Sequence, residues 1–303
     1  LEPEDSLDVV PIGASQLYTG YSAPLAWQDY GFTSYPLTVS NIPARLYGSL
    51  LTEAVNRQHP KLIVVDIDGF LTDEDPEKLE ANLRKWIDNM PWSRNRIETI
   101  RTCVPAELQS SFYFNIAKYH ANWYQPDTWL PVQQRLRAMD KTGYSLSKGV
   151  ETVCKSLPAD FVPDVRPLTL SGANAQYLRD FCAQAQSIGT DVLFLRTPHR
   201  TQTTDPNVFA DVAAVVGEYG YELLDLHDAF DTIGLDRCAD FIDSDHLNTI
   251  GMEKFTVWFG QYLTGRYDLT DAHSEAVTAE WERCADFAAQ TLPLCKELAA
   301  ENT

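Results

Sequence analysis

The run Lys61-Leu-Ile-Val-Val-Asp-Ile67 decides the fold class of this chain. It is almost continuously apolar and rich in β-branched side chains, a composition typical of a strand that is covered on both faces. Strands of this kind occur in parallel sheets whose faces are covered by helices. We therefore expect an α/β protein with this strand near the centre of its sheet.

Strands and helices alternate on both sides of this run. Further strands are predicted at residues 7–12, 35–39, 191–196 and 221–226. Helices are predicted at residues 24–30, 43–57, 173–187 and 206–219. This order implies a mostly parallel sheet with helices on both faces.

Two stretches fall outside the alternation. Residues 71–165 are polar, aromatic-rich and mostly helical in pattern, which indicates a helical insertion lying over the sheet. Residues 274–303 form a C-terminal helical extension, whose helix over 274–298 is expected to break at Pro293. We treat residues 1–303 as one domain that contains both.

The composition excludes several classes of function. The chain has 303 residues, 44% of them hydrophobic, and a formal net charge of −19. So acidic a chain lacks the clustered Lys and Arg that nucleic acid requires, and it is unsuited to direct adhesion to anionic membranes. No apolar run approaches membrane-spanning length. An acidic surface of this kind is otherwise an ordinary solubility feature.

The six cysteines leave the disulfide pattern open. None forms a Cys-x-x-Cys pair, which argues against zinc-ribbon or thioredoxin chemistry. Cys182 lies in an apolar helical pattern and is expected to be a buried thiol. Cys284 and Cys295 could pair only if the helix breaks at Pro293.

A candidate general base lies in the stretch Asp243-Ser-Asp-His-Leu-Asn-Thr-Ile-Gly251. A helix follows, with its N-terminus expected near Thr249, a good N-cap; its apolar stripe is Met252, Phe255, Phe259 and Tyr262. The stretch thus presents His246 at a helix N-terminus beside two carboxylates. A nearby carboxylate can fix the tautomer of such an imidazole, which then acts as a base.

A candidate nucleophile lies at the opposite end of the chain, in Gly13-Ala14-Ser15 after the first strand. Working residues of parallel sheets collect at the carboxyl ends of the strands, so we expect the strand-end residues to meet at one edge. These are Ser15, Asn41, Asp68 and the loop 243–246. The structural alternatives are a small residue in a tight turn for Ser15 and a helix-capping imidazole for His246. Asp245 is the rival of Asp243 as the partner of His246.

These two motifs together resemble the SGNH (GDSL-type) hydrolase superfamily. Asp-His-Leu-Asn-x-x-Gly at 245–251 is typical of its final sequence block, and Gly-x-Ser is typical of its extracytoplasmic branch. That branch includes the D-alanyl-lipoteichoic acid transfer protein and the alginate O-acetylation proteins. Leu-Arg-Thr-Pro-His at 195–199 and Tyr-His-Ala-Asn-Trp at 119–123 are similar to it as well. The resemblance covers roughly residues 5–70 and 168–265.

The resemblance implies a three-layer, flavodoxin-like parallel sheet and a catalytic triad. Ser15 matches the nucleophile, His246 the base and Asp243 the orienting acid. The family's oxyanion hole uses the amide of the nucleophile, a Gly amide and an Asn side chain. Asn41 and Gly69 are the candidates here, although the family's Gly-x-Asn-Asp block is absent.

The resemblance further implies a serine esterase or O-acyltransferase that acts on an acylated cell-envelope polymer or glycan, without cofactor or metal. His120 and His199 are candidate substrate-binding residues. A membrane-bound O-acyltransferase is a possible partner, and the full-length protein is expected to be extracytoplasmic or on the cell surface, with a membrane anchor.

Two other functions are considered. One is a non-catalytic SGNH-like module that binds a glycan or a membrane acyltransferase. The other is a flavodoxin-like phosphate or nucleotide binder, which ranks last because the turn at Gly13 has a single glycine. His227, beside Asp225 and Asp228, is interpreted as a solvated strand end rather than a metal ligand.

Overall fold

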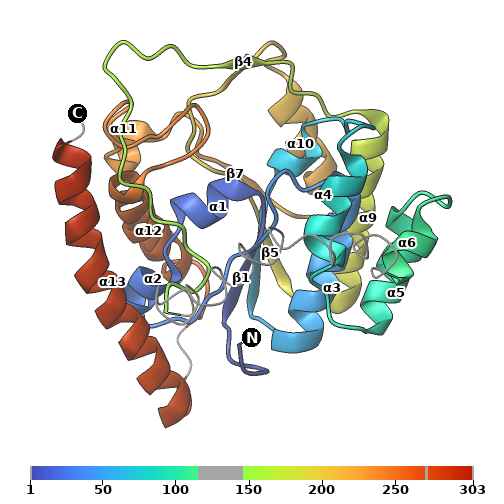
Figure 1. The fold of residues 1–303 in the computed structure, drawn as a ribbon, viewed down its shortest axis with the longest axis horizontal. Coiled ribbons are helices and arrows are strands. Elements are labelled where there is room, and N and C mark those ends of the chain that lie inside the picture. Colours follow the sequence, from blue (N-terminus) through green and yellow to red (C-terminus); the bar gives the residue numbers. More distant parts are fainter. Residues whose placement is uncertain (1, 115–145, 270–271, 302–303) are drawn as a thin grey trace, which may run out of the picture.

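The computed structural model describes residues 2–114, 146–269 and 272–301, and its centre is a five-stranded sheet (Figure 1). Along the sheet lie β2 (Leu37–Thr38), β1 (Val9–Gly13), β3 (Leu62–Asp66), β5 (Asp191–Arg196) and β7 (Leu223–Asp225). All neighbouring strands are parallel. The predicted α/β class with a mostly parallel sheet is confirmed.

Strand β3 can occupy the middle of the sheet because all of its side chains except that of Asp66 are apolar. All five of its residues are buried, including Asp66 at its carboxyl end. Ile12 of β1 lies beside Val65, and Phe194 of β5 lies beside Val65 on the other side. β2 and β7 are shorter than predicted and only partly buried, as edge strands can be.

Helices cover both faces of the sheet (Figure 1). One face carries α1 (Ser15–Gly20), α2 (Ala23–Tyr30) and α12 (Thr249–Thr264), and α12 contacts both of the others. The other face carries α3 (Tyr47–Gln58), α9 (Gly172–Ile188) and α10 (Val208–Gly217), with α9 between its two neighbours. Short helical turns η1 (Ala44–Leu46), η2 (Asp68–Phe70) and α11 (Phe230–Ile233) complete this part.

The order of the strands reverses at β1, and this reversal positions the site. From β1 the chain first goes outward to β2, then returns to the other side of β1 to form β3 and later β5 and β7. In open parallel sheets, ligands bind beyond the carboxyl ends of the strands at such a reversal point. The loops after β1 and β3 are therefore the expected walls of a binding crevice.

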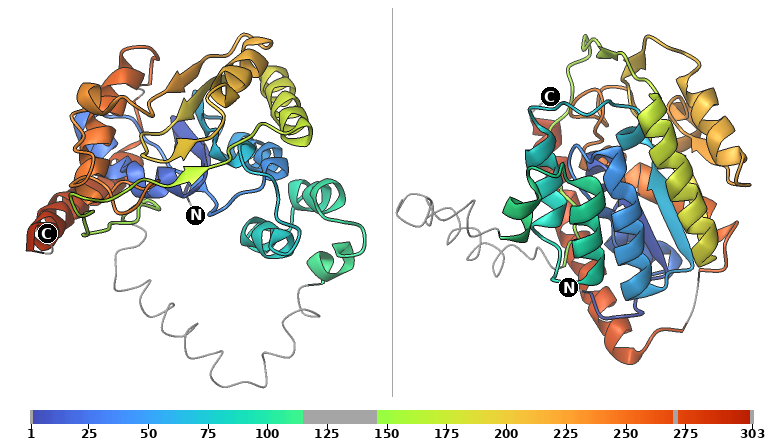
Figure 2. Two further views of the ribbon diagram at one scale, coloured as in Figure 1. Left: turned by 90° about the horizontal axis from the view of Figure 1, so that it is seen from above. Right: turned by 90° about the vertical axis from the view of Figure 1, so that its right-hand side faces the viewer.

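The region predicted as a helical insertion contains three helices in its first, described part. They are α4 (Leu79–Ile87), α5 (Arg94–Cys103) and α6 (Gln109–Tyr113). They stack on the outer side of α3, not over the sheet as expected, because α5 packs against α3 (Figure 2). Residues 146–164 form neither helix nor strand, and β4 (Val165–Arg166) then pairs with β6 (Gln202–Thr203) in a small sheet that the sequence did not predict.

The C-terminal helix α13 (Glu275–Glu301) continues through Pro293, so the predicted break is wrong. Its buried residues pack on the rest of the fold and hold the helix together despite the missing amide of Pro293. A disulfide joins Cys295 to Cys154, while Cys284 and Cys182 are buried free thiols. Cys182 is thus a buried thiol, as predicted. None of the described helices is both long and apolar enough to cross a membrane.

Candidate active site

Ser15 stands at the first residue of α1, directly after the turn that ends β1. The turn lies against β3, because a Cβ added to Gly13 would come 2.5 Å from Cβ of Asp66. The amide of Ala14 donates a hydrogen bond to Oδ2 of Asp66 at 3.2 Å. The sequence therefore needs glycine at position 13, and the contact with β3 fixes the position of the Ser15 turn.

The structure brings Ser15, His246 and Asp243 into one hydrogen-bonded chain. Oγ of Ser15 lies 2.7 Å from Nε2 of His246. Nδ1 of His246 lies 2.9 Å from each carboxylate oxygen of Asp243. This is the arrangement that a serine nucleophile, its base and an orienting acid require.

Asp245 has a different role from Asp243. Its carboxylate hydrogen-bonds Thr201 and pairs with Arg166 at 2.5 Å, so it contacts neither nitrogen of the imidazole. Oδ1 of Asp243, in contrast, also accepts the amides of Asp245 and His246 at 2.8 and 2.9 Å. The short loop thereby fixes Asp243, and not its rival, beside the imidazole.

The local charges favour a basic imidazole. Burial lowers the pKa of His246, but its hydrogen bond with Asp243 and the charges of Asp243, Asp245 and Asp68 outweigh burial and raise that pKa above the ordinary value. Burial raises the pKa of Asp243, but its bonds to His246 and to the Asp245 amide outweigh this and lower it. The pair is therefore an ionised carboxylate beside an imidazole of increased basicity.

The loop 243–246 is anchored on both sides. Oγ of Ser244 accepts the amide of Asp164 at 2.8 Å, and its carbonyl accepts the amides of Arg200 and Thr201. Asn248, not Thr249, is the N-cap of α12, and its side-chain oxygen accepts two amides at 3.0 Å. Thr249 is instead the first helical residue. These contacts fix the backbone on both sides of His246.

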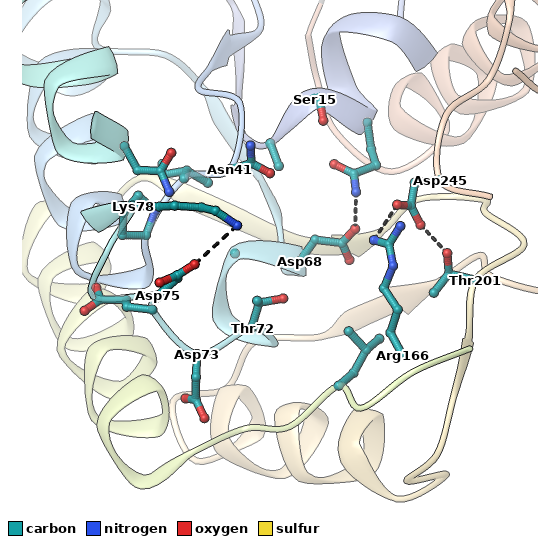
Figure 3. A pocket seen from close by; sticks show the side chains of 18 of the residues that line it. Ser15, Asn41, Asp68, Thr72, Asp73, Asp75, Lys78, Arg166, Thr201 and Asp245 are labelled. Atoms are coloured by element: carbon teal, nitrogen blue, oxygen red, sulfur yellow. Dashed lines mark hydrogen bonds and ion pairs between the residues drawn. The ribbon is translucent and has the colours of Figure 1, made fainter. Parts of the chain in front are cut away.

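A cavity of about 340 Å³ opens beside Ser15 and His246 (Figure 3). Its wall combines apolar surface with charged side chains, of which many more are acidic than basic. The charged residues that line it are Asp68, Asp73, Glu74, Asp75, Asp245, Lys78 and Arg166. Both basic groups are paired, since Lys78 binds Asp75 at 3.2 Å and Arg166 binds Asp245. The cavity is large enough for an ester of a sugar-sized molecule.

The two candidate oxyanion residues line this cavity, and each donates a hydrogen bond within the protein; Nδ2 of Asn41 donates to Oγ of Ser40 at 3.5 Å. Asn41 follows β2 in a left-handed conformation, with φ 52°, a region in which Asn is among the better tolerated side chains. The amide of Gly69 donates to the hydroxyl of Tyr47 at 3.2 Å, so in this structure it is already engaged within the protein. Gly69 therefore does not offer the free donor expected from the sequence.

His199 also lines the cavity, although it is only 2% exposed and does not lie on a solvated loop. Nε of Arg196 donates to its Nε2 at 3.2 Å, and its ring lies 4.6 Å from that of His227. Burial, followed by the charge of Arg196, keeps the pKa of His199 well below its ordinary value. A neutral imidazole of this kind can bind a polar oxygen of a substrate but does not attract an anion. The other candidate, His120, lies outside the described residues.

His227 lies against His199 and is partly buried, so the interpretation as a solvated strand end is wrong. Within the described ranges, no group of three or more His, Cys, Asp or Glu side chains could hold a metal ion.

Several residues of the site were not singled out by the sequence. Gln16 follows Ser15, and its Nε2 donates to Oδ2 of Asp68 at 2.6 Å. Asp68 itself was expected at this edge, because it follows the clearest strand. Arg166 and Thr201 could not be expected, because they reach the cavity through the unpredicted β4–β6 pair and its flanks. The chain matches no protein-family model, and no curated protein is similar to it in sequence.

Proposed function

We propose that this chain is an SGNH-type serine esterase or O-acyltransferase. The observation that carries the proposal is the chain of hydrogen bonds from Ser15 through His246 to Asp243, at 2.7 and 2.9 Å, at the edge of a cavity. A structural role for these residues does not require this combination of a hydroxyl, a basic imidazole and an ionised carboxylate facing one cavity.

The residues support a two-step acyl transfer. Oγ of Ser15 attacks the ester carbonyl while Nε2 of His246 takes its proton, and Asp243 stabilises the resulting imidazolium. His246 then gives this proton to the departing alkoxide oxygen, which leaves an acyl group on Ser15. Water or an acceptor hydroxyl reverses these steps, and the acceptor decides between hydrolysis and transfer. The amide at the start of α1, which the helix leaves unpaired, is suited to stabilising the oxyanion.

The topology of the sheet supports the resemblance on which the substrate class rests. Counted in chain order, the strands follow the pattern 2-1-3-4-5 of flavodoxin-like sheets, with the candidate site at the reversal point. We propose from the resemblance that the substrate is an acylated cell-envelope polymer or glycan, and that a membrane-bound O-acyltransferase is a partner. The bond between Cys154 and Cys295 supports a place outside the cytoplasm, because disulfides persist in oxidising compartments.

A fluorophosphonate serine-hydrolase probe tests the proposal. The native protein is expected to be labelled, and Ser15→Ala, which removes only the hydroxyl, is not. Circular dichroism of both proteins establishes that they are folded. If neither protein is labelled, Ser15 is not an activated nucleophile and the proposal is refuted.

A second candidate is a non-catalytic module that binds the glycan or the acyltransferase partner. The engagement of the Gly69 amide by Tyr47 favours it, because the site then lacks one expected oxyanion donor. Calorimetric titration with acetylated and deacetylated oligosaccharides tests this function. A non-catalytic module is expected to bind the oligosaccharide equally well in the native protein and in Ser15→Ala. It is also expected to leave Ser15 unlabelled by the fluorophosphonate probe.

A further inference from the structure

Asp68 lies in the loop after β3, and its carboxyl accepts a hydrogen bond from Gln16, the residue after Ser15. β1 and β3 are parallel neighbours, and Ile12 of β1 lies beside Val65 of β3. The loops that follow these two strands therefore start next to each other. Ser15 and Asp68 each come three residues after these paired positions. Figure 3 shows the carboxyl group of Asp68 inside the cavity that Ser15 and His246 line. Gln16 holds it there by the bond of 2.6 Å to Oδ2.

The surroundings of Asp68 decide whether it is charged. Six ionisable groups from the sheet, α3, the β4–β6 pair and the loop 243–246 interact electrostatically with its carboxyl. They are Asp66, Tyr47, Asp245, Arg196, Arg166 and His246. Burial, followed by the charge of Asp245, raises the pKa of Asp68 to about 6, although Arg196, Arg166 and His246 oppose the rise.

Asp66, immediately behind it, is fully buried and its Oδ1 has no partner among the described residues. Burial and then the charge of Asp68 raise the pKa of Asp66 well above its ordinary value. A proton on Asp66 therefore leaves Asp68 as the carboxyl that titrates within the cavity.

The charge of Asp68 matters because acyl transfer creates a negative oxygen beside Ser15. An ionised carboxylate in the same cavity would repel that oxygen, whereas a neutral carboxyl group would donate a hydrogen bond to it. A buried neutral Asp is a known chemical solution for such a donor. Since Gln16 donates to Oδ2, the proton of the neutral form belongs on Oδ1.

We propose that Asp68 is a catalytic residue that acts as a neutral acid, donating the hydrogen bond of its Oδ1–H to the carbonyl oxygen of the ester that acylates Ser15. The proton remains on Asp68 throughout, so no proton transfer is added to the reaction of Ser15 and His246. This inference rests on the proposed function, and it supplies the oxyanion donor that the engaged amide of Gly69 does not.

A neutral Asp68 beside an unprotonated His246 gives the activity an unusual pH dependence. The active form needs Asp68 protonated and His246 unprotonated, yet the pKa of Asp68, about 6, lies below that of His246. Above its pKa, the protonated fraction of a carboxyl falls about tenfold per pH unit. The fraction of Asp68 that can donate is then roughly one tenth at pH 7 and roughly one hundredth at pH 8. Asparagine, which donates through its amide group at every pH, removes this loss.

The experiment compares the native protein with Asp68→Asn and Asp68→Ala from about pH 5 to 9. It measures kcat/KM for p-nitrophenyl acetate, corrected for spontaneous hydrolysis, and the rate of fluorophosphonate labelling. Activity of the native protein is expected to fall on the alkaline side. Asp68→Asn is expected to lack this fall and to exceed the native value about 10-fold at pH 7 and about 100-fold at pH 8. Asp68→Ala is expected to be slow at every pH.

Two further variants separate this role from a structural one. Asp211→Asn, which removes a carboxylate from an exposed position of α10, is expected to retain the native pH profile. Gln16→Met removes the hydrogen bond on Oδ2 that favours ionised Asp68, so the alkaline fall is expected to move to higher pH. If Asp68 only positioned Gln16, Asp68→Asn and Gln16→Met would both lower activity without moving the alkaline fall.

The outcomes are distinguishable. If the native protein reacts through Ser15 and Asp68→Asn keeps the alkaline fall or is slower at every pH, the role of Asp68 is refuted while the proposed function stands. If the folded native protein and Asp68→Asn both fail to react at any pH, the proposed function is refuted and the inference with it. If only Asp68→Asn reacts at pH 8, both are supported.

Discussion

Exchanging Asp243 for Asn tests the acid of the triad, because it removes one charge while keeping the shape of the side chain. A hydrogen bond to an ionised acceptor contributes about 1.5–3 kcal/mol and a neutral one about 0.5–1.5 kcal/mol. The imidazolium that forms on His246 therefore loses about 1–2 kcal/mol, or roughly 10-fold in rate. In serine proteases the same exchange costs about 10⁴-fold, because it imposes the wrong tautomer. Here the amides of Asp245 and His246 hold Oδ1 as an acceptor, so we expect a loss of about 10- to 100-fold.

The assay is the pH profile of ester hydrolysis, with Asp245→Asn as the matched control. Asp243 raises the pKa of His246, and protonated His246 is inactive, so Asp243→Asn moves the acid-side fall in activity to lower pH. Asp245 contributes only charge and no contact with the ring, so its exchange moves the acid-side fall less. A native rate in Asp243→Asn, or a larger shift of the acid-side fall in Asp245→Asn, would refute the assignment.

Three further predictions concern the scaffold of the site. Gly13→Ala places a Cβ 2.5 Å from that of Asp66, so we expect a loss of about 1–3 kcal/mol in the free energy of unfolding by urea, together with slower labelling of Ser15. Cys154→Ser opens a link across 141 residues of sequence and is expected to cost about 2–5 kcal/mol; mild reduction of the native protein should lower Tm equally, and a matching Tm before and after reduction would contradict this. Asn248→Ala removes the cap of α12 and leaves buried carbonyls unpaired, at a cost of about 2–4 kcal/mol, measurable by the same urea titration and contradicted by a change below about 0.5 kcal/mol.

The centre of the fold could be predicted because its signals are local. The run from Lys61 to Ile67 and the strand 191–196 are apolar enough to identify buried parallel strands directly, and both form in the structure. The β4–β6 pair could not be predicted, since two residues in each strand carry no periodicity. The continuity of α13 through Pro293 was missed because proline disfavours a helix locally, while burial along the rest of the helix compensates only in the folded protein.

The candidate catalytic residues could be singled out for the same reason. Ser15 follows a strand, and Asp243 and His246 share one short loop, so each is recognisable from its immediate neighbours. The role of a side chain such as His199 depends instead on a distant partner. Its tautomer is set by Arg196 and its exposure by packing against His227, and neither contact follows from spacing in the sequence. Residues whose chemistry is set by tertiary neighbours therefore escape sequence reasoning at this site.

The protonation states of Asp68 and His246 depend on each other. Ionised Asp68 is one of the charges that raise the pKa of His246, and protonated His246 in turn lowers the pKa of Asp68. When Asp68 takes up a proton, it stops stabilising the imidazolium, and the neutral imidazole becomes easier to form. Likewise, neutral His246 no longer favours ionised Asp68. The pair therefore titrates as a unit. Asp68→Asn fixes one partner in its active state and should consequently move the acid-side fall of His246 to lower pH while it removes the alkaline one.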